Sequence, residues 1–191
     1  MTIGSLKQAQ EASGKVSVRN SKMPGSTFAA DPRACPAGSK LRQIKGTSCN
    51  SCYACKLVAI RPTVAKGYAS NQDFMVNAPF ETFVEGMVFQ ITKAALKTGE
   101  AYHRWFDAGD LASYDVLCRI GEVAKRTPHI QHWLPTQEAG LVRKYVQQNE
   151  TFPTIMADAE EDAEWDPDAE LMVEWLKEIE AAPENYFGPQ E

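Results

Sequence analysis

The chain has 191 residues, of which 43% are hydrophobic and 24% charged, and its formal net charge is −5. This composition is ordinary for a globular protein, and the length suits one domain with its own apolar core. The sequence has no run of about 18 apolar residues, which argues against a membrane-spanning helix. The first residues also carry no apolar signal-peptide core, so we expect a reducing, cytoplasmic location in which free thiols persist.

Charge is distributed unevenly along the chain. Residues 1–66 have a net charge of +9, whereas residues 158–191 have a net charge of −12. A basic half predicts an anionic partner, for example a nucleic acid, and an acidic tail either solvates the protein or masks the basic half. The alternative is that both stretches are simply solvated surface.

Helices and strands are predicted to alternate in the second part of the chain, after an irregular first part. Glycine and proline interrupt residues 1–75, where alternation predicts only an edge strand over residues 15–19. A helix is predicted from Pro79, with Asn77 as its cap and Gly99 at its end. The further predicted elements are a strand over 101–107, a helix from Ser113 to Pro128, a strand over 129–134, a helix near 139–148, a strand over 154–157 and an acidic amphipathic helix that begins at Asp166-Pro167.

This alternation predicts an α/β fold with a small, partial parallel sheet, flanking helices and an irregular N-terminal metal-binding loop. We expect a single domain over residues 1–191. Its parts are a cysteine-rich region (1–75), a β-α-β core (76–157) and an acidic C-terminal helix (158–191).

Four of the five cysteines lie in one window. Cys49, Cys52 and Cys55 recur at every third residue, and Cys35, followed by Pro36, supplies a remote fourth thiol. Spacings of two residues between thiolates let a tight loop direct several sulfurs at one centre, as in bacterial ferredoxins. The pattern therefore predicts one [4Fe-4S] cluster bound by all four cysteines.

Zinc is the strongest alternative to the cluster, because four thiolates also form structural zinc sites, although these usually present two separated pairs. Disulfides require an oxidising compartment, and inert buried thiols would not gather in one window. A radical enzyme that uses S-adenosylmethionine fits less well, because it needs a different cysteine spacing and an open iron.

Acidic and hydroxyl side chains follow the predicted strands. Asp107 and Asp110 follow the first strand, Thr136 and Glu138 the second, and Asp158 the third. Functional groups collect at the carboxyl ends of parallel strands, so paired acids there could act as general acid and base or hold a hard cation. Alternatively, Asp110 and Glu138 begin or cap helices.

Four polar or thiol side chains lie inside predicted strands and helices. Arg104 lies in an apolar strand and needs a partner, with Asp107 or Asp110 the nearest candidates. His103 and His132 lie in predicted strands and are expected to be hydrogen-bonded core residues, although either could replace a thiolate ligand. Cys118 is expected to be a small buried hydrophobe in a helix.

Several of these motifs together resemble the phage gene product 88 family. They are Asn20-Ser21-Lys22-Met23, the run from Cys35 to Leu41, Cys49-Asn50-Ser51-Cys52-Tyr53-Ala54, the run from Arg104 to Asp110, and Trp133-Leu134-Pro135-Thr136. The resemblance covers roughly residues 20–140. It implies a bacteriophage origin and a location in the cytoplasm of the infected host. The Cys-x2-Cys-Tyr-Ala element is also similar to radical-enzyme-like phage proteins. The family pattern does not require a cysteine at position 55.

The sequence thus predicts a phage-encoded iron–sulfur protein with a redox or regulatory role and no membrane partner. Two alternatives stay open. One is a cluster-dependent enzyme that uses Asp107, Asp110 and Thr136, and the other is a zinc-stapled module that binds nucleic acid through residues 1–66.

Overall fold

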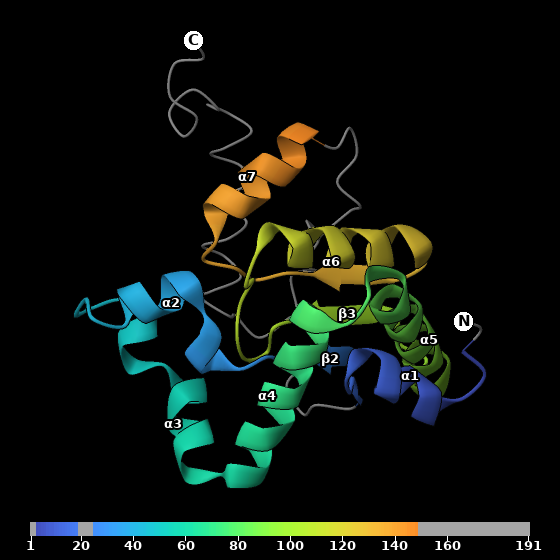
Figure 1. Cartoon of the computed structure of the whole chain (residues 1–191), viewed down its shortest axis with the longest axis horizontal. Helices are drawn as coiled ribbons and strands as arrows, with labels where there is room; N and C mark the ends of the chain where they lie inside the picture. Colours follow the sequence, from blue (N-terminus) through green and yellow to red (C-terminus); the bar gives the residue numbers. More distant parts are fainter. Residues whose placement is uncertain (1–2, 19–24, 149–191) are drawn as a thin grey trace. The chain divides into compact units, whose positions relative to one another are not determined.

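The computed structural model describes residues 3–18 and 25–148. The chain divides into two units, Met1–Ile155 and Met156–Glu191. The predicted strand over residues 154–157 and the predicted acidic helix lie outside the described residues. The described residues all belong to the first unit, which has the mixed α/β fold that the sequence predicts (Figure 1).

Seven α-helices, two short 3-10 helices and four strands lie in the described ranges. In chain order they are α1 (Leu6–Ser13), β1 (Ser17–Val18), β2 (Ser26–Phe28), η1 (Pro32–Ala34), α2 (Pro36–Leu41), η2 (Ser48–Ser51), α3 (Tyr53–Ile60), α4 (Pro62–Asn77), α5 (Phe80–Thr98), β3 (Tyr102–Trp105), α6 (Tyr114–Arg126), β4 (Gln131–Trp133) and α7 (Ala139–Gln148). None of these helices is both long enough and apolar enough to cross a membrane.

The strands form one sheet in the order β1-β2-β3-β4. β1 pairs with β2 antiparallel, whereas β2, β3 and β4 are parallel to one another. The register places His103 opposite both Ser26 and His132. The small parallel sheet is therefore confirmed, with β1 as the predicted edge strand and β2 as a strand that the sequence pattern did not reveal.

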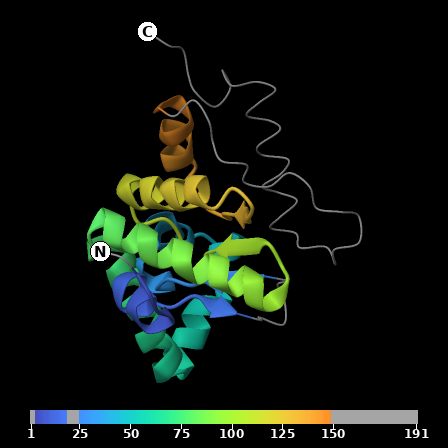
Figure 2. The same ribbon diagram turned by 90° about the vertical axis from the view of Figure 1, so that its right-hand side faces the viewer.

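The core lies between one face of the sheet and the helices α5 and α6. Phe28, Phe83 and Trp105 are fully buried, and the ring of Phe28 packs edge-on against that of Phe83 with centroids 6.3 Å apart. Figure 2 shows α5 between α1 and α6. The ends of two helices follow from local sequence, because Ser113 caps α6 and Gly99 ends α5 with a φ of 78°.

The prediction that residues 1–75 are irregular is wrong for most of that stretch, which contains α1 to α4. α1 has few large apolar residues, because it packs through Ala9, Ala12 and Ser13. A Cβ atom at Gly86 of α5 would lie only 2.5 Å from the Ser13 Oγ, so the two helices approach closely through small residues. Such contacts involve few large apolar side chains, so the sequence pattern is harder to detect.

Candidate functional site

The carboxyl ends of the three parallel strands lie together, and the cysteine-bearing segment begins there. The segments at the ends of β2 and β3 remain hydrogen-bonded to each other. Phe106 N donates to Phe28 O and Ala30 N donates to Ala108 O, both at 2.8 Å. Cys35 follows a few residues later, and α2 and α3 project from this end of the sheet (Figure 1). Ligand sites commonly occupy this edge of a parallel sheet.

Gly109 keeps the first two strand ends in contact. Its φ is +90°, and a Cβ atom there would lie 2.8–2.9 Å from Cβ, C and O of Ala30. Both the left-handed backbone and the lack of space require glycine.

We expect Gly109→Ala to lower the free energy of unfolding by about 2–4 kcal/mol, because backbone strain and a clash with Ala30 both destabilise the folded state. Urea unfolding measures this change. Gly99→Ala is the matched control, because Gly99 has a similar φ of +78° but a Cβ atom there would meet nothing within 4 Å. If both substitutions cost the same, the close approach to Ala30 is not the cause.

Asp110 connects the end of β3 to the loop after β4. Its Oδ1 accepts hydrogen bonds from the Thr136 hydroxyl at 2.5 Å and from Leu111 N, and its Oδ2 accepts one from Gln137 N at 2.8 Å. Burial raises the pKa of the Asp110 carboxyl, although these hydrogen bonds act in the opposite direction. Asp110 does not cap α6, since Ser113 holds that position. The structure thus brings the predicted pair Asp110 and Thr136 together, and their hydrogen bond helps to fix the loop.

Glu138 connects the same loop to the cysteine segment. Its Oε1 accepts a hydrogen bond from Ala37 N, in the first turn of α2, at 2.5 Å. Asp107 makes a second connection, because its Oδ2 accepts from the Thr27 hydroxyl and its carbonyl oxygen accepts from the Tyr53 hydroxyl at the start of α3. The Glu138 carboxylate therefore holds α2 against the strand ends, and the backbone carbonyl of Asp107 holds α3 there.

The guanidinium of Arg104 lies over the ring of Trp133, 4.1 Å from its centroid. The two residues are paired across β3 and β4. A cation over an aromatic face accounts for a charged residue within an apolar strand.

The four thiols of the cysteine segment lie near one another. A Cβ atom at Gly38 would lie 2.9 Å from Cys35 Cβ, 3.7 Å from Cys35 Sγ and 3.8 Å from Cys49 Sγ, so both cysteines pack closely against this glycine. Cys52 also contributes to the raised pKa of the Cys55 thiol, so these two side chains lie close together. Among the described residues, however, no three His, Cys, Asp or Glu side chains are already arranged to hold a metal ion.

Burial is the main influence on the cysteine thiols. It raises the pKa of Cys35 to about 12, and the negative charges of Asp110, Cys52 and Cys55 add to this effect. Burial likewise raises the pKa of Cys49 and of Cys55, each with a smaller contribution from Cys52. The charge of Cys52 thus acts on each of the other three thiols, as expected for neighbouring groups.

Arg42 supplies the positive charge in this group, and sequence reasoning missed it. It favours the thiolate forms of Cys35, Cys49 and Cys55. Its Nη2 donates to Pro32 O at 3.0 Å, and its Nε is buried with no hydrogen-bond partner within the described part of the chain. Many basic residues lie in this segment, so no sequence signal distinguishes Arg42 from the others.

The remaining candidates lie elsewhere. His103 and His132 are buried between the sheet and its helices, where His103 Nδ1 contacts the Ser26 hydroxyl and His132 Nδ1 accepts from Trp105 Nε1. The prediction that both are hydrogen-bonded core residues is confirmed. Cys118 is half-buried on α6 and packs against the main core.

Together these features define a mixed α/β protein in which a cysteine-rich helical segment is held at the carboxyl end of three parallel strands. The chain belongs to the Gene product 88 family, a bacteriophage family whose model matches residues 4–176. Neither the curated proteins nor the solved structures include a significant match.

Proposed function

We propose that this phage protein binds one [4Fe-4S] cluster through Cys35, Cys49, Cys52 and Cys55 and serves a redox or regulatory role in the cytoplasm of the infected host. The observation that carries the proposal is that Cys35 and Cys49 pack against the same glycine near the strand ends, with Cys52 and Cys55 close enough for their charges to act on Cys35. A bound cubane cluster would supply one-electron chemistry at that edge.

The donor set and its surroundings support this assignment. Four thiolates satisfy a cubane cluster, and both Cys35 and Cys49 pack against Gly38. Side-chain rotation of the cysteines would be needed to converge on a cluster, since no three acidic, histidine or cysteine side chains in the described ranges already do so. Such adjustment is normal, because metal binding is coupled to local folding. The charge of Arg42 would offset part of the negative charge of four thiolates.

Metal analysis of protein purified without oxygen tests the proposal. We expect brown protein with about four irons and four acid-labile sulfides per chain. Stoichiometric zinc without sulfide would contradict the proposal and indicate a structural zinc site instead.

Nucleic-acid binding through residues 1–66 is the second candidate function. Residues 33–66 contain seven Lys or Arg and no Asp or Glu, and most of these cations are exposed. Lys40, Lys45, Lys56 and Arg61 form no ion pair within the described ranges, whereas Arg33 pairs with Asp31. A segment with unpaired cations and no carboxylates of its own attracts polyanions.

A further inference from the structure

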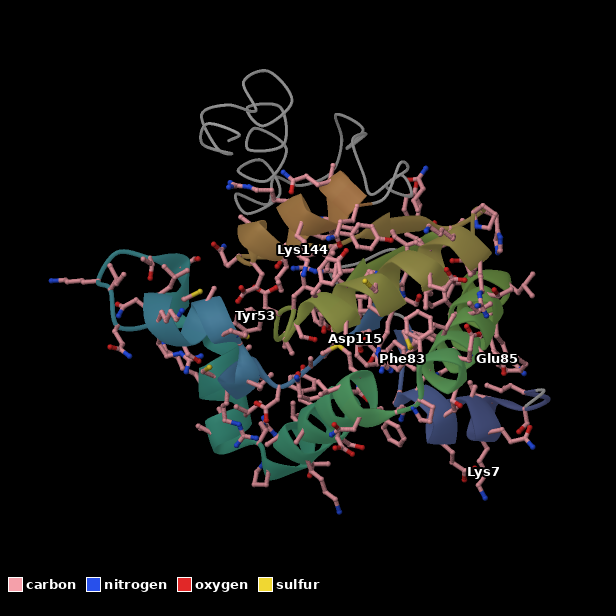
Figure 3. All side chains as sticks on the ribbon, turned by 45° about the horizontal axis from the view of Figure 1, so that its top comes forward. Lys7, Tyr53, Phe83, Glu85, Asp115 and Lys144 are labelled. Carbon is pink, nitrogen blue, oxygen red and sulfur yellow. The ribbon has the colours of Figure 1, made fainter. Side chains whose placement is uncertain are left out.

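The outer face of α3 combines a fixed aromatic ring with unpaired positive charge. Tyr53, Lys56 and Ile60 are exposed and lie at positions i, i+3 and i+7, which share one face of a helix. Ala54 and Val58 are buried on the opposite side. Figure 3 shows Tyr53 on the side of the protein that carries α2 and α3.

The Tyr53 ring is both open to solvent and anchored. The residue is 66% exposed, yet its hydroxyl donates to the carbonyl oxygen of Asp107 at the end of β3. An anchored ring loses little conformational freedom when a ligand stacks on it. An exposed ring that is held in place is therefore suited to a planar ligand.

Cations lie on both sides of this ring along the chain. Lys56 follows it by one helical turn, Arg61 lies at the end of α3, and Lys40 and Lys45 lie in and after α2. Asn50 Nδ2 donates to Arg42 O at 2.8 Å and so fastens η2 to the residue that follows α2. The cations and the ring are therefore parts of one folded segment.

We propose that the α3 outer face, formed by Tyr53, Lys56 and Ile60 with the neighbouring cations, binds single-stranded nucleic acid, with one base stacked on Tyr53. This inference rests on the second candidate function and specifies its ligand. A single strand offers both phosphates for the cations and unpaired base faces for the ring. A duplex conceals its base faces, and an acidic peptide has charge but few planar groups.

Fluorescence anisotropy on the full chain tests the inference with a labelled oligothymidylate, its duplex with oligoadenylate, and an abasic oligomer of equal length. We expect the single strand to bind about tenfold more tightly than the abasic oligomer, because base–aromatic stacking is lost in the latter. The abasic oligomer has the same phosphates, so this comparison needs no variant. We also expect the single strand to bind more tightly than the duplex.

Variants locate the effect. Tyr53→Leu should weaken binding of oligothymidylate about tenfold and leave abasic binding unchanged, whereas Tyr53→Phe should retain most of the difference. Lys56→Gln should reduce the slope of log affinity against log salt by about 0.7, as expected for one lost phosphate contact on a single strand. Lys7→Gln on α1 and Tyr102→Leu on β3 are the charge and aromatic controls, because both residues are exposed outside α2 and α3. Figure 3 labels Lys7.

Each failure has a distinct meaning. Equal affinity for the base-containing and abasic strands would overturn the stacking inference while Lys56→Gln still reports nucleic-acid binding. Equal binding of polyglutamate would overturn it in favour of an acidic protein partner. Absence of binding to any oligomer at low salt would overturn the inference and the second candidate function together, with the cluster proposal decided separately by metal content.

Discussion

Cys49→Ser and Cys52→Ser should each reduce cluster loading from about four irons per chain to almost none. Each substitution removes one of the four proposed ligands, and the loop around Gly38 has no other donor of the same kind in the described ranges. Because metal binding is coupled to folding, both variants should also unfold at lower temperature than the wild type. Iron and sulfide analysis together with circular dichroism melting measure the two effects.

Cys118→Ser is the matched control, because Cys118 packs on α6 away from the cysteine segment. It should retain the full iron content. Normal iron content in Cys49→Ser or Cys52→Ser would contradict the four-thiolate site.

Cys55→Ser separates the cluster protein from the cluster-dependent enzyme. We expect Cys55→Ser to lose the cluster, as should variants of the other three ligands. If this variant keeps a normal cluster, one iron is left open, and an enzyme that works beside Asp107, Asp110 and Thr136 becomes the better hypothesis.

Acid should destabilise the fold well before carboxylates are protonated, because of two buried histidines. Burial lowers the pKa of His132 to about 4, and it lowers the pKa of His103 well below 6.5. An unfolded chain binds protons at these groups near pH 6.5, but the folded chain does not. The free energy of unfolding is therefore not reduced by these histidines above pH 6.5. It falls as the pH drops toward 4, by about 3 kcal/mol for His132 alone.

The hydrogen bonds of His132 explain why the neutral form is required. Nδ1 accepts from Trp105 Nε1 at 3.1 Å, so it cannot carry a proton without breaking this bond. The Thr127 hydroxyl donates to Val123 O, which leaves its oxygen to accept from His132 Nε2 at 2.8 Å. One neutral tautomer satisfies all of these contacts.

Urea unfolding of wild type and His132→Gln across this pH range measures the effect. The variant should show a shallower pH dependence, whereas His129→Gln, at an exposed position, should change it only slightly, because burial is a larger cause of the lowered His132 pKa than the charge of His129. Asp110 acts in the opposite direction near the lower limit, because its raised pKa favours proton uptake by the folded state. An unchanged pH dependence in His132→Gln would show that another group controls acid unfolding.

Some elements could be predicted because their signals are local. α5 and α6 have an apolar stripe and terminal residues that can be recognised, Gly99 for α5 and Ser113 for α6. β3 and β4 each contain aromatic residues and lie between turn residues. The short strand β2 was missed because three residues are too few to show an alternating pattern. It is stabilised by its pairing with β3. α1 was missed because its contacts use small residues rather than large apolar ones.

The sequence by itself determined the α/β class, the family and the set of four cysteines, since spacing and periodicity are properties of the chain alone. Only the tertiary structure decided which groups surround those cysteines. Arg42, Glu138 and Gly38 lie at the site because parallel strands bring their carboxyl ends to one edge, where Glu138 reaches the backbone of α2. Contacts of this kind join residues as far apart in sequence as 37 and 138, and no local pattern encodes them.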